Sequence, residues 1–336
     1  MAAHPPAPAA LPTMPMIDWR PLHAAARPSV FIIVLTPRLK KTLTRVADTY
    51  GIKEEKELDE IFKADYLTET GIAVRTVGDF LFITTTAHIV DFLFQAQWGP
   101  ISAAQFNDYF EIAVTCSHAE SRFIQGGFVG ERTYTRATVC AIDCAKDLMM
   151  VRVDLRDLAV RTRGELQQRI RCTSDHPAVQ FSMATNAGTQ CMLYSWPAYR
   201  PCTMATGLQG LHRGPLDLMS TNKNGYDLQL IEASVGTEAG SSGAPLYNTN
   251  QQVLGILHGG SGVHSQFIPA RYIWTFINNN CLLPKPRGPQ DQGKPSQRPG
   301  PPPRDRDKRG PGGKPGTSDA SSKRIRSAAK DKTVAV

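Results

Sequence analysis

Two adjacent serines lie between glycines in GTEAGSSGAPLYN, residues 236–248, and either hydroxyl could act as a nucleophile. A nucleophilic serine needs a base that takes its proton and a carboxylate that orients the base. It also needs backbone N–H groups directed at the oxyanion that forms during attack. Gly240 and Gly243 permit a tight loop whose amides face inward. The pattern is G-x-S-G-x-P, and it differs from the G-x-S-x-G elbow of α/β-hydrolases because Gly243 directly follows Ser242.

Short strands must position this loop, because runs rich in Val, Ile, Phe and Thr recur between turn residues. These runs cover residues 29–36, 71–77, 80–86, 110–116, 134–142, 148–154, 179–183, 191–196, 226–233, 253–259 and 265–269. Many short strands with few helices favour one barrel or a pair of barrels over a βαβ sheet. Residues 38–69 are the exception, since their apolar residues recur at helical spacing and predict a helical insertion.

The serine loop GSSGAP resembles the nucleophile loop of chymotrypsin-like serine proteases, which places the nucleophile at Ser242. The family's chain order is His, Asp, Ser. FLFITTTAHIV resembles the strand and turn that carry the family's histidine, and it places the base at His88. AIDCAKDLMMVRVD resembles the aspartate segment and places the orienting carboxylate at Asp147. Asp143, four residues earlier in the same segment, is the alternative orienting residue.

The resemblance implies a mostly β fold of two six-stranded antiparallel β-barrels, here with the helical insertion and a C-terminal helix within SQFIPARYIWTFI. It implies a serine endopeptidase that hydrolyses peptide bonds through an acyl-enzyme, with no metal and no cofactor. The backbone N–H groups of Gly240 and Ser242 are the expected oxyanion donors. The candidate residues of the substrate pocket are Gly236, Glu238, His258 and Gly259.

Two positions separate this chain from the secreted branch of the family. Ile89 follows His88, where secreted members usually carry a disulfide-bonded cysteine. Ser241 precedes the nucleophile, where those members carry the aspartate that receives a newly cleaved N-terminus. The chain is more similar to intracellular, Deg-type trypsin-like peptidases, without the PDZ domain that often follows them.

The domain boundaries follow from composition. Residues 1–27 are rich in Pro and Ala and are expected to be a disordered lead, residues 28–283 are the peptidase domain, and residues 284–336 are a disordered tail rich in Pro, Gly and charge. The tail holds 14 Lys and Arg against 5 Asp, so subtracting its surplus of 9 from the net charge of +8 leaves −1 for residues 1–283. The peptidase domain therefore lacks a basic excess.

The seven cysteines, at positions 116, 140, 144, 172, 191, 202 and 281, form no C-x-x-C pair. They are expected to be reduced thiols of an intracellular protein in the cytoplasm or nucleus, with an organelle as the alternative. No apolar run is long enough to span a membrane, and the expected partner is a peptide or protein substrate. Two alternatives stay open: an inactive fold that serves as a binding platform, and a protein whose basic tail contacts nucleic acid or an import receptor. A virus-type protease of similar fold is a third.

Overall fold

The computed structural model describes residues 17–38, 67–89, 100–120, 132–161, 168–197, 203–215, 225–261 and 263–281. The chain divides into two units, residues 1–286 and 287–336, and the second lies wholly outside the described residues. The strands of the first unit are β1 (Val30–Pro37), β2 (Leu67–Val77), β3 (Phe80–Thr85), β4 (Phe110–Cys116), β5 (Thr135–Asp143), β6 (Leu148–Asp154), β7 (Ala159–Arg161), β8 (Arg169–Arg171), β9 (Gln180–Phe181), β10 (Gln190–Ser195), β11 (Thr203–Pro215), β12 (Gln229–Ala233), β13 (Pro245–Asn248), β14 (Gln252–Ser261) and β15 (His264–Pro269). Its described helices are α1 (Arg20–Ala26), the 3-10 helix η1 (Arg27–Ser29), α4 (Ala103–Tyr109), α5 (Ser117–Glu120) and α6 (Ala270–Asn280).

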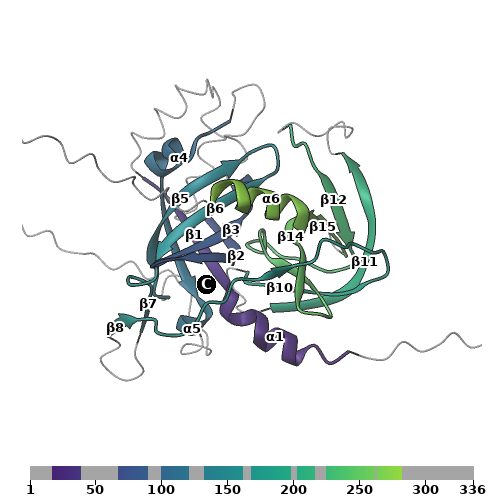
Figure 1. Ribbon diagram of the computed structural model, residues 1–336, viewed down its shortest axis with the longest axis horizontal. Coiled ribbons are helices and arrows are strands. Elements are labelled where there is room, and N and C mark those ends of the chain that lie inside the picture. Colours follow the sequence, from purple (N-terminus) through teal and green to yellow (C-terminus); the bar gives the residue numbers. More distant parts are fainter. Residues whose placement is uncertain are drawn as a thin grey trace, which may run out of the picture. The chain divides into compact units, whose positions relative to one another are not determined.

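Most strands belong to two antiparallel barrels (Figure 1). The first barrel closes in the order β1-β2-β3-β6-β5-β4. The second runs β13-β10-β11-β12-β15-β14 and closes through pairing between β13 and β14, while β9 adds to β14 in parallel. The helix α6 follows β15 and contacts β14, β15 and β5. The predicted pair of six-stranded barrels with a C-terminal helix is confirmed.

Strands at the junction of the barrels are buried on both faces. Successive side chains of a strand point to opposite sides, so β1 sends Ile33 into the first barrel and Ile32 into a core shared with the second. In the same way, β10 sends Leu193 into the second barrel and Tyr194 into the shared core. This explains why both strands are continuous apolar runs without alternation. The shared core fixes one barrel against the other.

The predicted disordered lead is wrong in its last part. Residues Arg20–Ala26 form α1, and its side chains Leu22 and Ala26 are buried in the shared core. These two residues are four positions apart and lie on one face of the helix. The sequence did not indicate this short apolar face, because alanines and prolines are frequent throughout the segment. Residues 1–16 lie outside the described residues.

The predicted helical insertion, residues 38–69, lies mostly outside the described residues, which resume at Leu67. Leu67, Thr68 and Glu69 were expected to be helical, but they are the first residues of β2. They pair with the end of β1, and this pairing in the barrel outweighs their local helical pattern. The tail at 284–336 also lies outside the described residues. None of the described helices is long and apolar enough to cross a membrane.

Candidate active site

The structure brings the three predicted catalytic residues together from both barrels. His88 lies just after β3, Asp147 lies in the turn between β5 and β6, and Ser242 lies in the loop before β13. His88 Nδ1 is 2.7 Å from Asp147 Oδ2, and His88 Nε2 is 2.9 Å from Ser242 Oγ. A carboxylate can only accept, so His88 carries its proton on Nδ1 when it is neutral. The Nε2 lone pair then faces the hydroxyl of Ser242.

Asp147 is fully buried and has a left-handed backbone conformation, with φ of 53°. Aspartate tolerates this conformation better than most residues, and here it directs the carboxylate inward. Its Oδ1 accepts the N–H groups of Ala87 at 2.9 Å and His88 at 2.7 Å. Burial by itself would raise the pKa of Asp147, but the adjacent imidazoles of His88 and His258 and their hydrogen bonds outweigh burial and hold the pKa well below its usual range. Asp147 is therefore ionised at neutral pH.

A second imidazole shares this carboxylate. His258 Nδ1 lies 2.5 Å from Asp147 Oδ2, and the ring meets that of His88 edge-on at a centroid distance of 5.4 Å. His258 lies at an irregularity of β14, where the pairing with β15 skips from Leu257 to Gly259. Such a bulge redirects a side chain. The sequence predicted a substrate-pocket residue here, and the structure places its ring against the carboxylate of Asp147.

His88, Asp147 and His258 are also a set that could hold a metal ion. Ligands around a tetrahedral ion at about 2.0–2.2 Å lie roughly 3.3–3.5 Å from one another. The two nitrogen–oxygen distances, 2.7 and 2.5 Å, are much shorter than this and are those of hydrogen bonds. Asp147 Oδ2 is therefore hydrogen-bonded to both imidazoles, and the two distances do not match those between ligands of a shared ion.

The loop around Ser242 leaves two amides for a ligand. The N–H groups of Ser241, Gly243 and Ala244 donate to the carbonyls of Glu238, Leu257 and Ser241. Within the described part of the chain, the N–H groups of Gly240 and Ser242 donate to no backbone carbonyl. These are the two donors that the sequence predicted for an oxyanion. Gly240 has φ of 87°, a conformation that only glycine adopts at little cost.

The other predicted site residues have different surroundings. Asp143 accepts the N–H of Lys146 at 3.0 Å within the turn, and this contact is local. Gly236 and Glu238 are exposed, while Gly259 is half-buried and has open space where a Cβ would point. The structure thus favours Asp147 over Asp143 as the orienting residue, because only Asp147 contacts His88.

Sequence reasoning missed a buried glutamate beside the site. Glu69 lies at the start of β2, where helix was predicted, and only 1% of its surface is exposed. Its Oε1 and Oε2 lie 2.9 Å from Thr86 Oγ1 and 2.8 Å from Thr85 Oγ1. Burial raises the pKa of Glu69 to about 8, although His88 and the two hydroxyls partly offset it. The run Thr84–Thr86 beside His88 was the available signal of a polar partner.

Glu69 is connected to the loop around Ser242 through Thr85 and Thr70. Thr85 Oγ1 is also 2.8 Å from the carbonyl of Thr70, and one hydroxyl proton cannot serve both acceptors. A protonated Glu69 resolves this conflict, since it donates to Thr85, which then donates to Thr70. Thr70 in turn donates its N–H to the carbonyl of Ser242 at 2.9 Å and its hydroxyl to that of Gly240 at 3.0 Å. Hydrogen bonds through Thr85 and Thr70 therefore connect the neutral carboxyl of Glu69 to the loop around Ser242.

We expect Glu69→Gln to remove a pH-dependent loss of stability. Because the pKa of Glu69 is raised on folding, the folded chain binds a proton that the unfolded chain lacks between about pH 4.5 and 8. Over this range the free energy of unfolding of the wild type should fall relative to the variant, by about 1.4 kcal/mol per pH unit. The glutamine amide reproduces the neutral acid, because it can accept from Thr86 and donate to Thr85.

Urea unfolding of both proteins at several pH values between 5.5 and 7.5 measures this difference. Glu111→Gln is the matched control, because Glu111 lies on the exposed face of β4. It removes one surface carboxylate and so gives the reference against which the pH trend of Glu69→Gln is compared. A constant difference between wild type and Glu69→Gln over the same range would contradict a raised pKa at Glu69.

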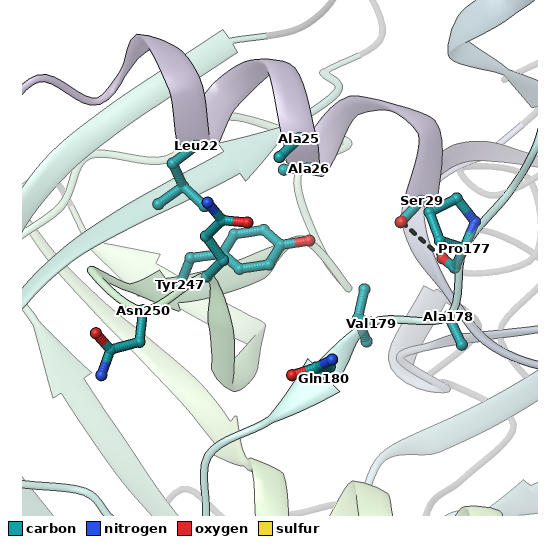
Figure 2. Close-up of a pocket in the computed structure, with 11 residues that line it drawn as sticks. Leu22, Ala25, Ala26, Ser29, Pro177, Ala178, Val179, Gln180, Tyr247 and Asn250 are labelled. Atoms are coloured by element: carbon teal, nitrogen blue, oxygen red, sulfur yellow. Dashed lines mark hydrogen bonds between the residues drawn. The ribbon is translucent and has the colours of Figure 1, made fainter.

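A pocket elsewhere in the chain involves none of the predicted site residues. It is lined by α1, by residues 177–180 and by the turn after β13, and Leu22, Val179 and Tyr247 are among its side chains (Figure 2). It does not include the serine, the histidine or the loop amides. We therefore do not assign it to the substrate.

No protein family model matches the chain, and no curated protein matches it in sequence. Solved structures that are similar to it include the active form of the Rv3671c protease from M. tuberculosis, with 16% identity, 84% of this chain and 96% of that chain covered, and a TM-score of 0.48. Deg5 has 14% identity, covers 76% and 90% of the two chains and has a TM-score of 0.45. The HtrA-type protease AlgW with a tripeptide has 14% identity, 78% and 63% coverage and a TM-score of 0.48.

The chain's own topology is sufficient to assign its fold. Six antiparallel strands close the first barrel, six close the second, and a helix follows the last strand. The histidine and aspartate come from the first barrel and the serine from the second. This chain has the two-barrel fold of the chymotrypsin-like serine proteases.

Proposed function

We propose that the chain is a serine endopeptidase, with Ser242 as the nucleophile, His88 as the base and Asp147 as the orienting carboxylate. The observation that carries this proposal is the continuous hydrogen-bonded path from Asp147 Oδ2 through the imidazole to Ser242 Oγ. In this path the base and the nucleophile are within the distance that proton transfer requires. Asp147 keeps the imidazole in the tautomer whose Nε2 can accept a proton.

The reaction follows from these positions. Ser242 Oγ attacks the carbonyl carbon of the substrate while its proton passes to His88 Nε2, and the ionised Asp147 stabilises the imidazolium that forms. The N–H groups of Gly240 and Ser242 donate to the oxyanion of the tetrahedral intermediate. His88 then gives its proton to the leaving amine, which departs and leaves an acyl-enzyme. Water attacks the ester by the reverse route, and Ser242 recovers its proton.

A peptide substrate is favoured by the edge of β14. Its pairing with β13 ends at Ile256, whereas its pairing with β15 continues to Ser261. Among the described residues, positions 259–261 therefore have a strand on one side only. An extended peptide can add to such an edge through its backbone. Because Gly259 leaves open space there, the strand can guide a polypeptide toward Ser242.

Labelling with a fluorophosphonate probe tests the proposal. The probe reacts with a serine whose proton has a ready acceptor, so we expect the wild type to be labelled. Ser242→Ala and His88→Ala should lower the labelling rate by at least about 10³-fold. Ser241→Ala is the matched control, since Ser241 is buried and, among the described residues, its hydroxyl has no hydrogen-bond partner. It should keep the wild-type rate.

Two outcomes would contradict the proposal. Equal labelling of Ser242→Ala and wild type would place the reactive group elsewhere, and an unlabelled but folded wild type would favour the binding platform. Cleavage of a library of internally quenched peptides, blocked by the same probe, then separates an endopeptidase from an esterase. The basic tail lies outside the described residues, and its contact with nucleic acid or an import receptor stays a prediction.

A further inference from the structure

Four metal-binding side chains converge at a place that shares no residue with the catalytic site. Cys116 is the last residue of β4, His118 lies in α5, and Cys172 and His176 lie between β8 and β9. One ligand atom of each residue lies within 4.8 Å of the ligand atoms of the other three. They come from two short patterns, Cys-x-His and Cys-x₃-His, that are far apart in the chain.

The distances within this cluster are those of a tetrahedral metal site. Cys172 Sγ lies 3.9 Å from Cys116 Sγ, 3.8 Å from His118 Nδ1 and 3.5 Å from His176 Nε2. Zinc binds sulfur at about 2.3 Å and imidazole nitrogen at about 2.0–2.1 Å. A tetrahedron with these bond lengths separates two sulfurs by about 3.8 Å, and a sulfur and a nitrogen by about 3.5 Å. The three distances from Cys172 match these separations, and the other ligand atoms lie within 4.8 Å of one another.

A disulfide does not account for the arrangement. The sulfur atoms of Cys116 and Cys172 are 3.9 Å apart, nearly twice the S–S bond length of about 2.05 Å. Both imidazoles also direct a nitrogen at Cys172. Two thiols and two imidazoles facing one point are the donor set that zinc prefers, because soft sulfur and borderline nitrogen ligands select it over Mg²⁺ or Ca²⁺.

A contact behind one ligand fixes its orientation. His176 Nδ1 lies 2.9 Å from the carbonyl oxygen of Pro28, in η1. A carbonyl can only accept, so Nδ1 carries the proton and Nε2 presents its lone pair to the cluster. Histidines that bind metals usually donate their other ring N–H in this way. The ring is also packed against Phe31, with the centroids 5.0 Å apart.

We propose that Cys116, His118, Cys172 and His176 bind one structural Zn²⁺ ion. Four protein ligands fill a tetrahedral shell, so no position is left for water or substrate, and the ion serves the fold. Burial agrees with this role, since Cys116, Cys172 and His176 are all buried. The sequence predicted reduced thiols and no metal, because a C-x-x-C pair is the usual pattern of a zinc site, whereas each half of this site pairs a cysteine with a histidine.

The site joins parts of the chain that are distant in sequence. Cys116 and Cys172 are 56 positions apart, and closing so long a loop restricts the unfolded chain. The segment after His176 leads to β9, which pairs with β14 of the second barrel. Pro177 in that segment accepts a hydrogen bond of 2.7 Å from Ser29 Oγ (Figure 2). The ion therefore anchors the connection between the barrels to the first barrel.

The metal content of the full chain, measured by mass spectrometry after purification without added metal or chelator, tests the proposal. We expect about one zinc per chain in the wild type, and less than about a tenth of this in Cys116→Ser and Cys172→Ser. Cys140→Ser is the matched control, because Cys140 is an exposed cysteine that lies outside the cluster, and it should keep the zinc. Ser242→Ala should keep it as well, so the result does not depend on the proposed protease activity.

A second measurement covers the case in which the cysteine variants do not fold. Wild-type chain refolded with Co²⁺ should show the intense visible bands of tetrahedral cobalt and a near-ultraviolet band from thiolate-to-cobalt charge transfer. A folded wild type that contains no zinc and takes up no Co²⁺ into such a site would overturn the proposal. So would wild-type zinc content in folded Cys172→Ser, or a Cys116–Cys172 disulfide in a mass-spectrometric peptide map.

Discussion

Asp147→Asn should lower the rate of peptide hydrolysis and of probe labelling by about 10⁴-fold, while the chain stays folded. Both imidazoles that face Asp147 direct Nδ1 at the same oxygen, Oδ2, at 2.7 and 2.5 Å. Oδ1 accepts two backbone N–H groups, so the amide oxygen of asparagine takes this side and its NH₂ faces the imidazoles. His88 must then accept at Nδ1, and its proton moves to Nε2. In this tautomer Nε2 cannot take the proton of Ser242.

Asp143→Asn is the control for this experiment. Asp143 is the last residue of β5, four residues before Asp147, and its side chain accepts the backbone N–H of Lys146, which an amide oxygen also accepts. We expect its rate within about threefold of the wild type. A folded Asp147→Asn protein with the wild-type rate would exclude Asp147 as the orienting residue. A large loss in Asp143→Asn alone would transfer the role to Asp143.

Gly243→Ala should cost at least about 3 kcal/mol of unfolding free energy and abolish labelling. Gly243 has φ of 81°, and a Cβ there would lie 2.1 Å from the carbonyl oxygen of Thr70 and 2.3 Å from Thr85 Oγ1. Neither neighbour can move freely, because both belong to strands of the first barrel. The methyl group would therefore push the nucleophile loop away from β2 and separate Ser242 from His88.

Gly188→Ala isolates the steric part of this effect. Gly188 has the same φ of 81°, but a Cβ there meets nothing within 4 Å. This substitution should cost only the roughly 1–2 kcal/mol of a left-handed alanine and leave labelling unchanged. Urea unfolding gives both free energies. Equal losses of unfolding free energy in the two variants would contradict the close contact between Gly243 and Thr70 of β2.

The local pattern of residue types along the sequence was sufficient to predict much of the fold. Runs of β-branched and aromatic residues predicted strands such as Phe110–Cys116 and Leu148–Asp154 at their observed bounds, because a strand in a buried sheet selects these residue types. The long strand β11 was missed, since its glycines weaken the strand pattern. Gly207 is required there by a neighbour in space, because a Cβ would lie 2.1 Å from the carbonyl of Ser234.

The sequence by itself determined the residue types and chain order of the candidate triad, since His88, Asp147 and Ser242 each lie in a short pattern that depends on a local turn or strand. Tertiary structure alone decided which other groups surround them. A bulge in β14 turns His258 to Asp147, and strand pairing brings Glu69 under the nucleophile loop. The proposed zinc ligands meet only because the barrel closes β4 against the segment before β9. Contacts of this kind depend on strand register and barrel closure, and local sequence patterns determine neither of them.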